Sequence, residues 1–234
     1  MKLAEFGGTS LFQNTLKRAI EISGSKTDFR IVTNENYKFH CITQGEEIGI
    51  PVTEKNLIVE PKAKNTLAAI MLAIRSLDDD HDLALVLPSD HAIENARAFK
   101  EAIFNAVPTA KKSLVTFGIL PDHPNTGYGY IHPTGPCETT PAAVSEFKEK
   151  PDFETAEKYV KEGYLWNAGI FLFSKEVFDN ELEKVDSAYF ATFAKYDTVE
   201  EIFDNLPDLS IDYGLLEKTK NVSVLSADIG WTDL

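Results

Sequence analysis

The sequence predicts an α/β fold, a Rossmann-like doubly wound sheet that is mixed but mostly parallel and carries helices on its faces. Three observations predict it. Apolar stretches suited to strands alternate with amphipathic stretches suited to helices through the first 120 residues. The 234 residues, 43% of them hydrophobic, suffice for one complete core. No internal repeat, linker or low-complexity segment interrupts the pattern. Strands separated by helices favour right-handed crossovers and therefore a mostly parallel sheet.

The stretch that organises the chain runs from residue 82 to residue 91. Leu83–Leu87 is apolar without alternation, which predicts a strand buried on both faces. Pro88 ends this strand because proline cannot donate to a sheet ladder. Asp90 is then expected just past the carboxyl end of a central parallel strand, where open α/β sheets bind ligands. Its carboxylate suits a divalent cation that bridges phosphate oxygens, or else it caps a helix beginning near Asn95.

The remaining elements of the first half follow in order. Ser10 and Gln13 form a capping box, which predicts a helix directly after it. The residues before this helix are too few for a strand followed by a nucleotide-binding loop. Further on we expect strands at 30–34, 56–61 and 113–119, and helices at 35–44, 65–77 and from about 95.

The second half differs in its sequence pattern: it has a loop rich in glycine and aromatic residues near residue 127, and more strands. Asp152 is expected to cap a surface helix. Asn167 interrupts an otherwise apolar strand, so it is either a ligand-facing amide or a satisfied hydrogen-bonding group of the core. The expected strands are 144–149, 165–173 and 221–225, and the expected helical segments are 175–206 and 211–218.

Composition excludes several classes of function. The formal net charge of −14 argues against a surface for nucleic acid or anionic membrane. Cys41 and Cys137 lie far apart, which argues against a disulfide framework or a thiolate zinc site. No apolar stretch reaches transmembrane length and no signal peptide opens the sequence. We therefore expect a cytoplasmic protein.

Several polar residues are placed where they could carry chemistry, each with a plainer alternative. Asp233 follows a strand and could share a metal with Asp90, or it could be a frayed terminal residue. Glu149 and Lys150 end a strand and could hold sugar hydroxyls and a phosphate, or form a solvated ion pair.

Two further segments carry weaker signals. Gly127–Gly129 could bring backbone N–H groups close to a ligand, or it could be an ordinary turn. Glu60 and the segment Asn65–Thr66 lie between a strand and a helix, a place suited to binding a base or a phosphate. The alternative is that Asn65 is simply the N-cap of the helix.

Nine segments, in order along nearly the whole chain, resemble those of the sugar-nucleotide pyrophosphorylases, and most closely the mannose-1-phosphate guanylyltransferase family. Each motif alone is weak, but nine in the same order are specific. They are Gly8–Gln13, Glu60–Pro61 with Lys64–Thr66, Leu87–His91, Val115–Ile119, Asn125–Ile131, Glu149–Pro151, Trp166–Gly169, Ser210–Tyr213 and Gly230–Asp233.

This resemblance implies a nucleotide-diphospho-sugar transferase fold similar to the GT-A type, and the reaction of GTP with mannose 1-phosphate to give GDP-mannose and pyrophosphate. It implies Mg²⁺ held by Asp90 and Asp233, with Lys150 as a catalytic cation near the sugar phosphate. The residues it implies for the nucleotide are Glu60, Lys64, Asn65, Thr66 and Ser89. Those it implies for the sugar are Tyr128, Gly129, Glu149 and Asn167. It implies one nucleotidyltransferase domain, with a nucleotide half at 1–120 and a sugar half at 121–234, and it allows a homo-oligomer.

The sequence also departs from the family pattern. The family begins with a strand and a glycine-rich loop that cradles the triphosphate, and nothing similar occurs here. Lys64 stands where arginine is usual. In the family the first strand lies in mid-sheet, so we expect unpaired backbone on both of its neighbours and poor activity of this chain alone. Two other functions stay open: a different sugar and base on the same fold, such as glucose 1-phosphate with UTP or dTTP, or a non-catalytic remnant that binds a sugar nucleotide.

Overall fold

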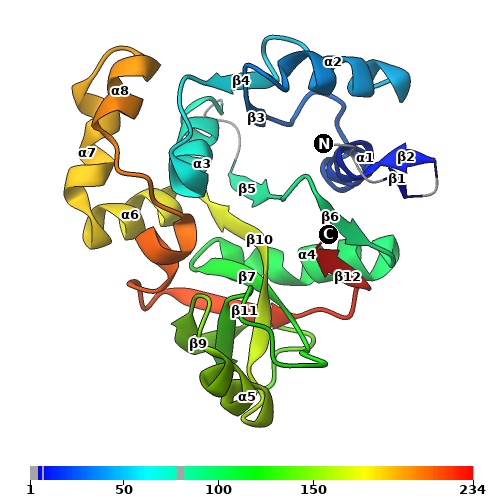
Figure 1. Ribbon diagram of the computed structural model, residues 1–234, viewed down its shortest axis with the longest axis vertical. Helices are drawn as coiled ribbons and strands as arrows, with labels where there is room; N and C mark the ends of the chain where they lie inside the picture. The colour runs from blue at the N-terminus through cyan, green and yellow to red at the C-terminus, as the bar shows by residue number, and fades with distance from the viewer. Residues whose placement is uncertain (1–4, 7, 78–81, 234) are drawn as a thin grey trace.

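A six-stranded mixed sheet forms the centre of the protein (Figure 1). The computed structural model describes residues 5–6, 8–77 and 82–233. The strand order is β5-β10-β7-β11-β9-β8. These strands are β5 (Leu83–Val86), β7 (Leu114–Ile119), β8 (Tyr130–Pro133), β9 (Ala142–Lys148), β10 (Leu165–Ser174) and β11 (Val222–Ser226).

Strand β10 determines how this sheet is arranged. It runs antiparallel to both β5 and β7 and lies between them, whereas β7 and β11 pair in parallel. Its first residues also pair with β8, so β10, β7, β11, β9 and β8 close into a ring of pairings. Strands from before and after residue 120 are thus interleaved in one sheet, and the predicted mixed α/β architecture is confirmed.

The prediction of a central parallel strand at Leu83–Leu87 was wrong. Strand β5 ends the strand order and is half-buried along its length, because β10 covers one edge and no described strand pairs with the other. Asp90 does not cap the following helix either. The side chain of Asn95 accepts the hydrogen bond from the Ala98 N–H instead.

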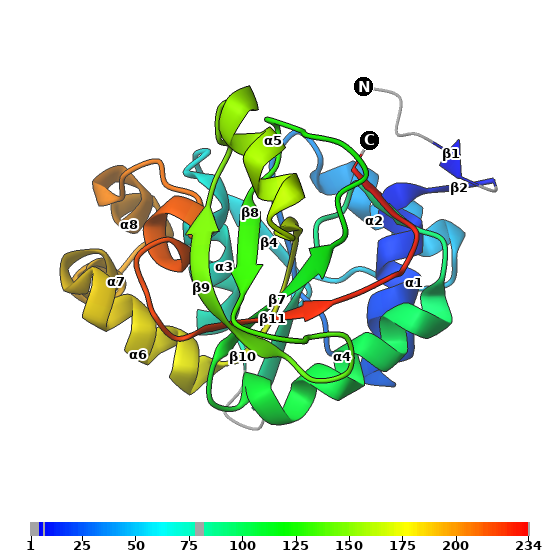
Figure 2. The same cartoon turned by 90° about the horizontal axis from the view of Figure 1, so that it is seen from below.

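Helices cover both faces of the sheet (Figure 2). Side chains of α4 pack on one face with Ile170 and Leu172, while α3 and α6 share the other face with Phe171 and Phe173. This division follows from the alternation of side chains along β10. The helices are α1 (Leu11–Ser23), α2 (Lys38–Glu47), α3 (Asn65–Arg75), α4 (Ala96–Ala110), α5 (Phe153–Lys161), α6 (Lys175–Val185), α7 (Ser187–Lys195), α8 (Val199–Asn205) and the π-helix η1 (Asp212–Leu216).

Most of the expected elements are present. The capping box at Ser10 and Gln13 starts α1, and Asp152 caps α5. Helix α2 begins later than expected, and the helical segment 175–206 divides into three helices because Asp186 and Thr198 each cap a new one. Cys41 is a free buried thiol, as is Cys137. Within the described ranges no helix is both long and apolar enough to cross a membrane.

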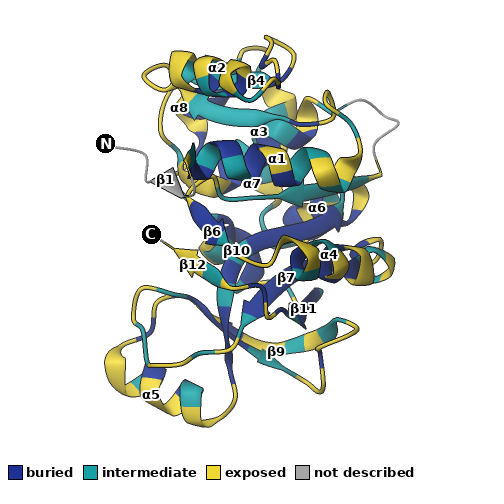
Figure 3. Cartoon of the chain, turned by 90° about the vertical axis from the view of Figure 1, so that its right-hand side faces the viewer, coloured by how far each residue is buried: buried dark blue, intermediate teal, exposed yellow. Residues whose placement is uncertain are grey.

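Three small sheets complete the fold: β1 (Glu5–Phe6) with β2 (Thr9–Ser10), β3 (Ile31–Asn34) with β4 (Leu57–Glu60), and β6 (His91–Ile93) with β12 (Trp231–Asp233). Among the described strands, β3 pairs only with β4 and β5 only with β10, so each has one edge without a described partner. Their residues are mostly half-buried, whereas β7 and β10 are mostly buried (Figure 3).

Candidate active site

A cavity of about 200 Å³ opens beside the bulged part of β10 and collects most of the predicted sugar-side residues. Its walls come from the start of α3, the end of β5, the loop before β8, the end of β9, β10, η1 and β12. The predicted site residues that line it are Thr66, Tyr128, Gly129, Glu149, Lys150, Asn167 and Asp233.

The pairing of β6 with β12 brings the two predicted metal ligands together. Asp233 lies opposite His91 in this antiparallel pair, and Asp90 directly precedes His91. Both carboxylates lie within 4 Å of one atom, the Nε2 of His91, at 3.6 Å for Asp233 and 3.9 Å for Asp90. No pattern in the sequence predicts this sheet, because three-residue strands are too short to show a periodicity.

His91 is a buried, neutral spacer between these acids and the core. The indole N–H of Trp231 donates to its Nδ1 at 3.1 Å, so the proton of the neutral ring is on Nε2, which faces the carboxylates. Burial lowers the pKa of His91 although Asp233 and Asp90 oppose this, and Arg18 adds to the lowering. At neutral pH the imidazole therefore adds no positive charge to the site.

The donor set fits a hard divalent cation that is shared with phosphate oxygens. The side chains of Asp90 and Asp233 are 63% and 40% exposed, so both are accessible. No cluster of three or more metal-ligating side chains occurs in the part of the chain that the structure describes. A cation held by these two acids would take its other ligands from substrate and water, as Mg²⁺ commonly does.

Glu149 is the buried acid of the cavity. Its Oε1 lies 3.4 Å from the Lys150 ammonium, and its Oε2 lies where a side chain at Gly129 would have to go. A Cβ on Gly129 would meet Oε2 at 2.5 Å, so only glycine allows this close approach. Burial, followed by the nearby Asp212 carboxylate, raises the pKa of Glu149 to about 7, against the opposing charge of Lys150.

Asn167 makes three hydrogen bonds within the protein through its amide. Its Oδ1 accepts from Thr116 Oγ1 at 2.8 Å and from the Gly169 N–H at 3.2 Å, and its Nδ2 donates to Asp212 at 2.9 Å. These bonds hold a bulge in β10, where the register shifts and Gly169 takes a φ of 67°. The amide is therefore bonded within the protein and also lies at the wall of the cavity, so the structure does not decide between the two interpretations from sequence.

Two predicted site residues share an unusual backbone conformation. Asn65 has a φ of 64° and Lys150 a φ of 45°, and they are the two non-glycine residues with positive φ among those described. Such strain concentrates at functional sites in folded proteins. Asparagine adopts this conformation readily, whereas lysine does not. The position of Lys150 is therefore imposed by its surroundings, which include a backbone bond from its N–H to the Tyr128 carbonyl at 3.2 Å.

The predicted nucleotide-side residues are not gathered in the same way, and only Thr66 lines the cavity. Lys64, not Asn65, occupies the N-cap position of α3, and its ammonium donates to the Leu206 carbonyl. Glu60 is half-buried at the end of β4, where burial raises its pKa and its Oε1 has no hydrogen-bond partner among the described residues. Ser89 is exposed beside Asp90.

Four residues in or beside the site had no assigned role in the sequence prediction. His91 and Trp231 join the two acids, and Trp231 and Trp166 each make an edge contact with Tyr128, with ring centroids 5.3 and 5.1 Å apart. Asp212 on η1 anchors Asn167 and faces Glu149, and burial raises its pKa. Their motifs were visible in the sequence, but their contacts depend on the tertiary structure.

Comparison with known proteins identifies the class of protein that this fold and site define. Residues 1–234 match the family described as Nucleotidyl transferase, and the chain belongs to that family. Its members generally use a divalent metal ion and act on a nucleoside triphosphate and a sugar 1-phosphate. The predicted family resemblance is confirmed.

Individual relatives are more specific. Over 244 residues the chain is 38% identical to a mannose-1-phosphate guanylyltransferase of Sinorhizobium fredii, covering 97% of this chain and 47% of that protein. The chain thus spans about half the length of this curated relative.

Solved structures confirm the nucleotidyltransferase α/β fold. A crystal structure described as mannose-6-phosphate isomerase from Helicobacter pylori is 30% identical with a TM-score of 0.85, covering 98% of this chain and 92% of that one. One described as mannose-1-phosphate geranyltransferase from Thermus thermophilus is 27% identical with a TM-score of 0.84, covering 97% and 67%.

Proposed function

We propose that this chain carries the sugar-nucleotide site of a mannose-1-phosphate guanylyltransferase, which joins GTP and mannose 1-phosphate into GDP-mannose and pyrophosphate. The observation that carries the proposal is the meeting of Asp90 and Asp233 at His91, next to the cavity that contains Glu149 and Lys150. Paired acids beside a small cavity that contains a carboxylate and an ammonium group suit nucleotidyl transfer. The names of the relatives support mannose and guanine as the sugar and the base.

In this proposal the chain positions reactants and provides charge. A phosphate oxygen of mannose 1-phosphate bonds to the α-phosphorus of GTP, and the bond to the bridging oxygen breaks as pyrophosphate leaves with its electron pair. Lys150 neutralises the sugar phosphate, and the carboxyl of Glu149 beside Gly129 binds sugar hydroxyls. Tyr128 and the Asn167 wall bound the sugar. Asp90 and Asp233 would hold Mg²⁺, which supplies charge for the phosphate oxygens when bound.

On the nucleotide side, we propose that Glu60, Lys64, Asn65, Thr66 and Ser89 border the base and ribose, with residues 1–120 as the nucleotide half and 121–234 as the sugar half. Thr66 supports this proposal best, since it lies at the cavity and its Oγ1 also accepts from the Ile211 N–H at 3.0 Å.

Binding of GDP-mannose, measured by isothermal titration with and without Mg²⁺, tests this function. We expect Mg²⁺ to increase the affinity of the unaltered chain for GDP-mannose. Asp233→Asn should reduce this Mg²⁺-dependent increase about tenfold or more, since a lost charge-assisted contact is worth roughly 1.5–3 kcal/mol. Asp228→Asn, an exposed acid five residues earlier in the chain, is the matched control. If Mg²⁺ has no effect, or if both variants behave alike, the proposal fails. UDP-glucose and dTDP-glucose in a thermal-shift panel test the other choices of base and sugar.

A second candidate, non-catalytic binding of a sugar nucleotide, is favoured by the charge of the cavity. Among its described lining residues, Lys150 is the one charged cation, because His91 is neutral. One positive charge from the protein provides little stabilisation for a triphosphate in a transition state. We therefore infer that this chain alone turns over slowly, and ordinary steady-state release of pyrophosphate from GTP and mannose 1-phosphate would refute that inference.

A further inference from the structure

Arg18 is a buried cation that the candidate active site does not use. Its residue is 9% exposed, and its Nη2 donates to Thr15 Oγ1 at 2.6 Å and to the His91 carbonyl at 3.2 Å. Its Nε is buried without a hydrogen-bond partner in the described ranges, and burial lowers the pKa of the guanidinium. A buried charge is costly, so an anion held close to the guanidinium would be stabilising.

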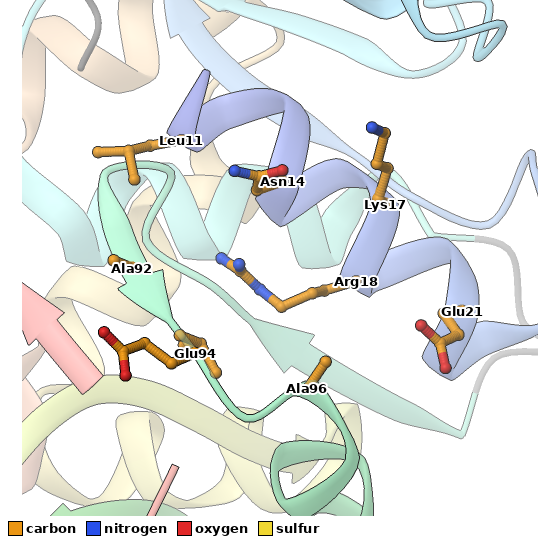
Figure 4. Close-up of a pocket in the computed structure, with 9 residues that line it drawn as sticks. Leu11, Asn14, Lys17, Arg18, Glu21, Ala92, Glu94 and Ala96 are labelled. Carbon is orange, nitrogen blue, oxygen red and sulfur yellow. The ribbon is translucent and has the colours of Figure 1, made fainter. Parts of the chain in front are cut away.

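A cavity of about 460 Å³ lies directly beside this guanidinium. It opens between α1, β6 and the first residue of α4, and it shares no lining residue with the candidate active site. Figure 4 shows the Arg18 side chain directed from α1 into the space in front of β6, toward Ala92. Its volume is in the range of small-molecule sites.

The groups around this cavity favour an anion. Lys17 lies on its rim and makes no hydrogen bond or ion pair with the described residues. Ala96 is the first residue of the 15-residue helix α4, so the free N–H groups of the first turn lie at the cavity. Asn95 caps only one of them, that of Ala98.

The two carboxylates of the lining do not neutralise these cations. Glu21 is paired with Lys100 at 3.5 Å. Glu94 packs against Gly230, and its carboxylate points away from α1 in Figure 4. The guanidinium of Arg18 and the start of α4 are left facing the cavity, whereas the Lys17 ammonium points away from Arg18 in Figure 4 and stays on the rim.

We propose that this cavity is a second ligand site, which binds the phosphate group of a small phosphorylated compound through Arg18 and the N-terminus of α4, with the flexible Lys17 side chain at the rim. The proposal does not depend on the proposed function. Arg18 also holds the backbone carbonyl of His91, whose side chain contacts Asp90 and Asp233, so an occupied site would fix the start of β6, which Asp90 precedes and with which Asp233 of β12 pairs.

Isothermal titration with inorganic phosphate, pyrophosphate and glucose 6-phosphate, at physiological chloride concentration, tests the proposal and distinguishes the source of the phosphate. We expect millimolar or tighter binding to the unaltered chain. Lys17→Gln should weaken it about three- to tenfold and Arg18→Met at least about tenfold, as expected for lost charge-assisted hydrogen bonds. Lys111→Gln, an exposed lysine just past the far end of α4, should change nothing.

Ala96→Glu is the most informative variant, because Arg18→Met could act through folding alone. A carboxylate in the first turn of α4 supplies the missing anion internally, so the variant should melt higher than the unaltered chain and no longer bind phosphate. Lys150→Gln must retain phosphate binding, because it alters the other cavity. No binding to the unaltered chain, equal binding to all variants, or binding that is lost in Lys150→Gln would each overturn the proposal, whatever becomes of the proposed function.

Discussion

The strands after residue 114 and those before residue 87 differ in how completely they are covered. Strands β7, β10 and β11 are almost entirely buried, while β3, β4 and β5 are half-buried although their residues are just as apolar. Each of the buried strands has a neighbour on both sides, whereas β3 and β5 have one each among the described strands. Burial therefore follows from neighbours in the sheet and not from hydrophobicity alone.

The same contrast separates the two sides of the site. Asn167 lies on the well-covered strand β10, and it contacts Gly129 and, through Gly129, Glu149, each of which has at least one neighbour in the ring of paired strands. Glu60 and Ser89 follow half-covered strands, and neither lines the cavity. Rigid neighbours position a side chain, and the nucleotide side has fewer of them.

The largest expected effect compares two leucines that face each other across β10 and β5. Leu172 is 3% exposed and lies opposite the half-buried Leu85 in the same cluster. Leu172→Ala should lower the free energy of unfolding by about 3–4 kcal/mol, and Leu85→Ala by only about 1–2 kcal/mol. Urea denaturation measures both, and equal losses would show that β5 is as well packed as β10.

The second comparison concerns two acids with raised pKa values. The pKa of Glu149 is raised to about 7, so the folded protein keeps a proton that the unfolded chain releases near 4.5. Its contribution to stability is thus present at low pH and is lost as the pH rises toward 7. As the pH rises through this interval, the free energy of unfolding of Glu149→Gln should increase relative to that of the unaltered chain, by about 3 kcal/mol at most.

Glu60→Gln is the matched variant on the half-covered side, where burial also raises the pKa of the acid. We expect it to show the same sign with a smaller change, because Glu60 is less buried than Glu149. Chemical denaturation of both variants at several pH values gives the result, and a larger effect at Glu60 would reverse the comparison.

The smallest expected effect compares the two strained residues. Lys150→Gly should raise the free energy of unfolding by about 0.5–1 kcal/mol, because glycine adopts a positive φ without strain, and it should weaken binding of GDP-mannose. Asn65→Gly should not raise the free energy of unfolding, since asparagine tolerates this conformation and its Oδ1 accepts a hydrogen bond from the Thr66 N–H. Thermal denaturation measures the stability of both variants, and titration with GDP-mannose measures their binding. A Lys150→Gly variant that is less stable than the unaltered chain would show that the backbone is not strained.

Local signals in the sequence predicted much of the fold. The capping box at Ser10, the cap at Asp152 and the apolar run of β10 each act over a few residues, and each is present. The central position of Leu83–Leu87 was wrong, because strand order depends on β10, whose sequence lies 80 residues further on. An apolar run does not indicate which strand becomes its neighbour.

The candidate site was predictable as residue types but not as contacts. The motifs containing Asp90 and Asp233 suggested paired acids, yet the three-residue strands that join them carry no pattern. The bulge at Gly169 and the anchoring of Asn167 by Asp212 arise from tertiary packing. The cavity beside Arg18 left no sequence signal, because arginine on an amphipathic helix is ordinarily a surface residue.

The aromatic contacts at Tyr128 make the site optically visible. The chain has two tryptophans, Trp166 and Trp231, and both rest edge-on against this one tyrosine at the wall of the cavity. All tryptophan emission of the protein therefore comes from residues that contact Tyr128, a lining residue of the cavity. We expect its intensity and wavelength to change when the cavity is occupied, so ligand association can be followed in real time without any attached label.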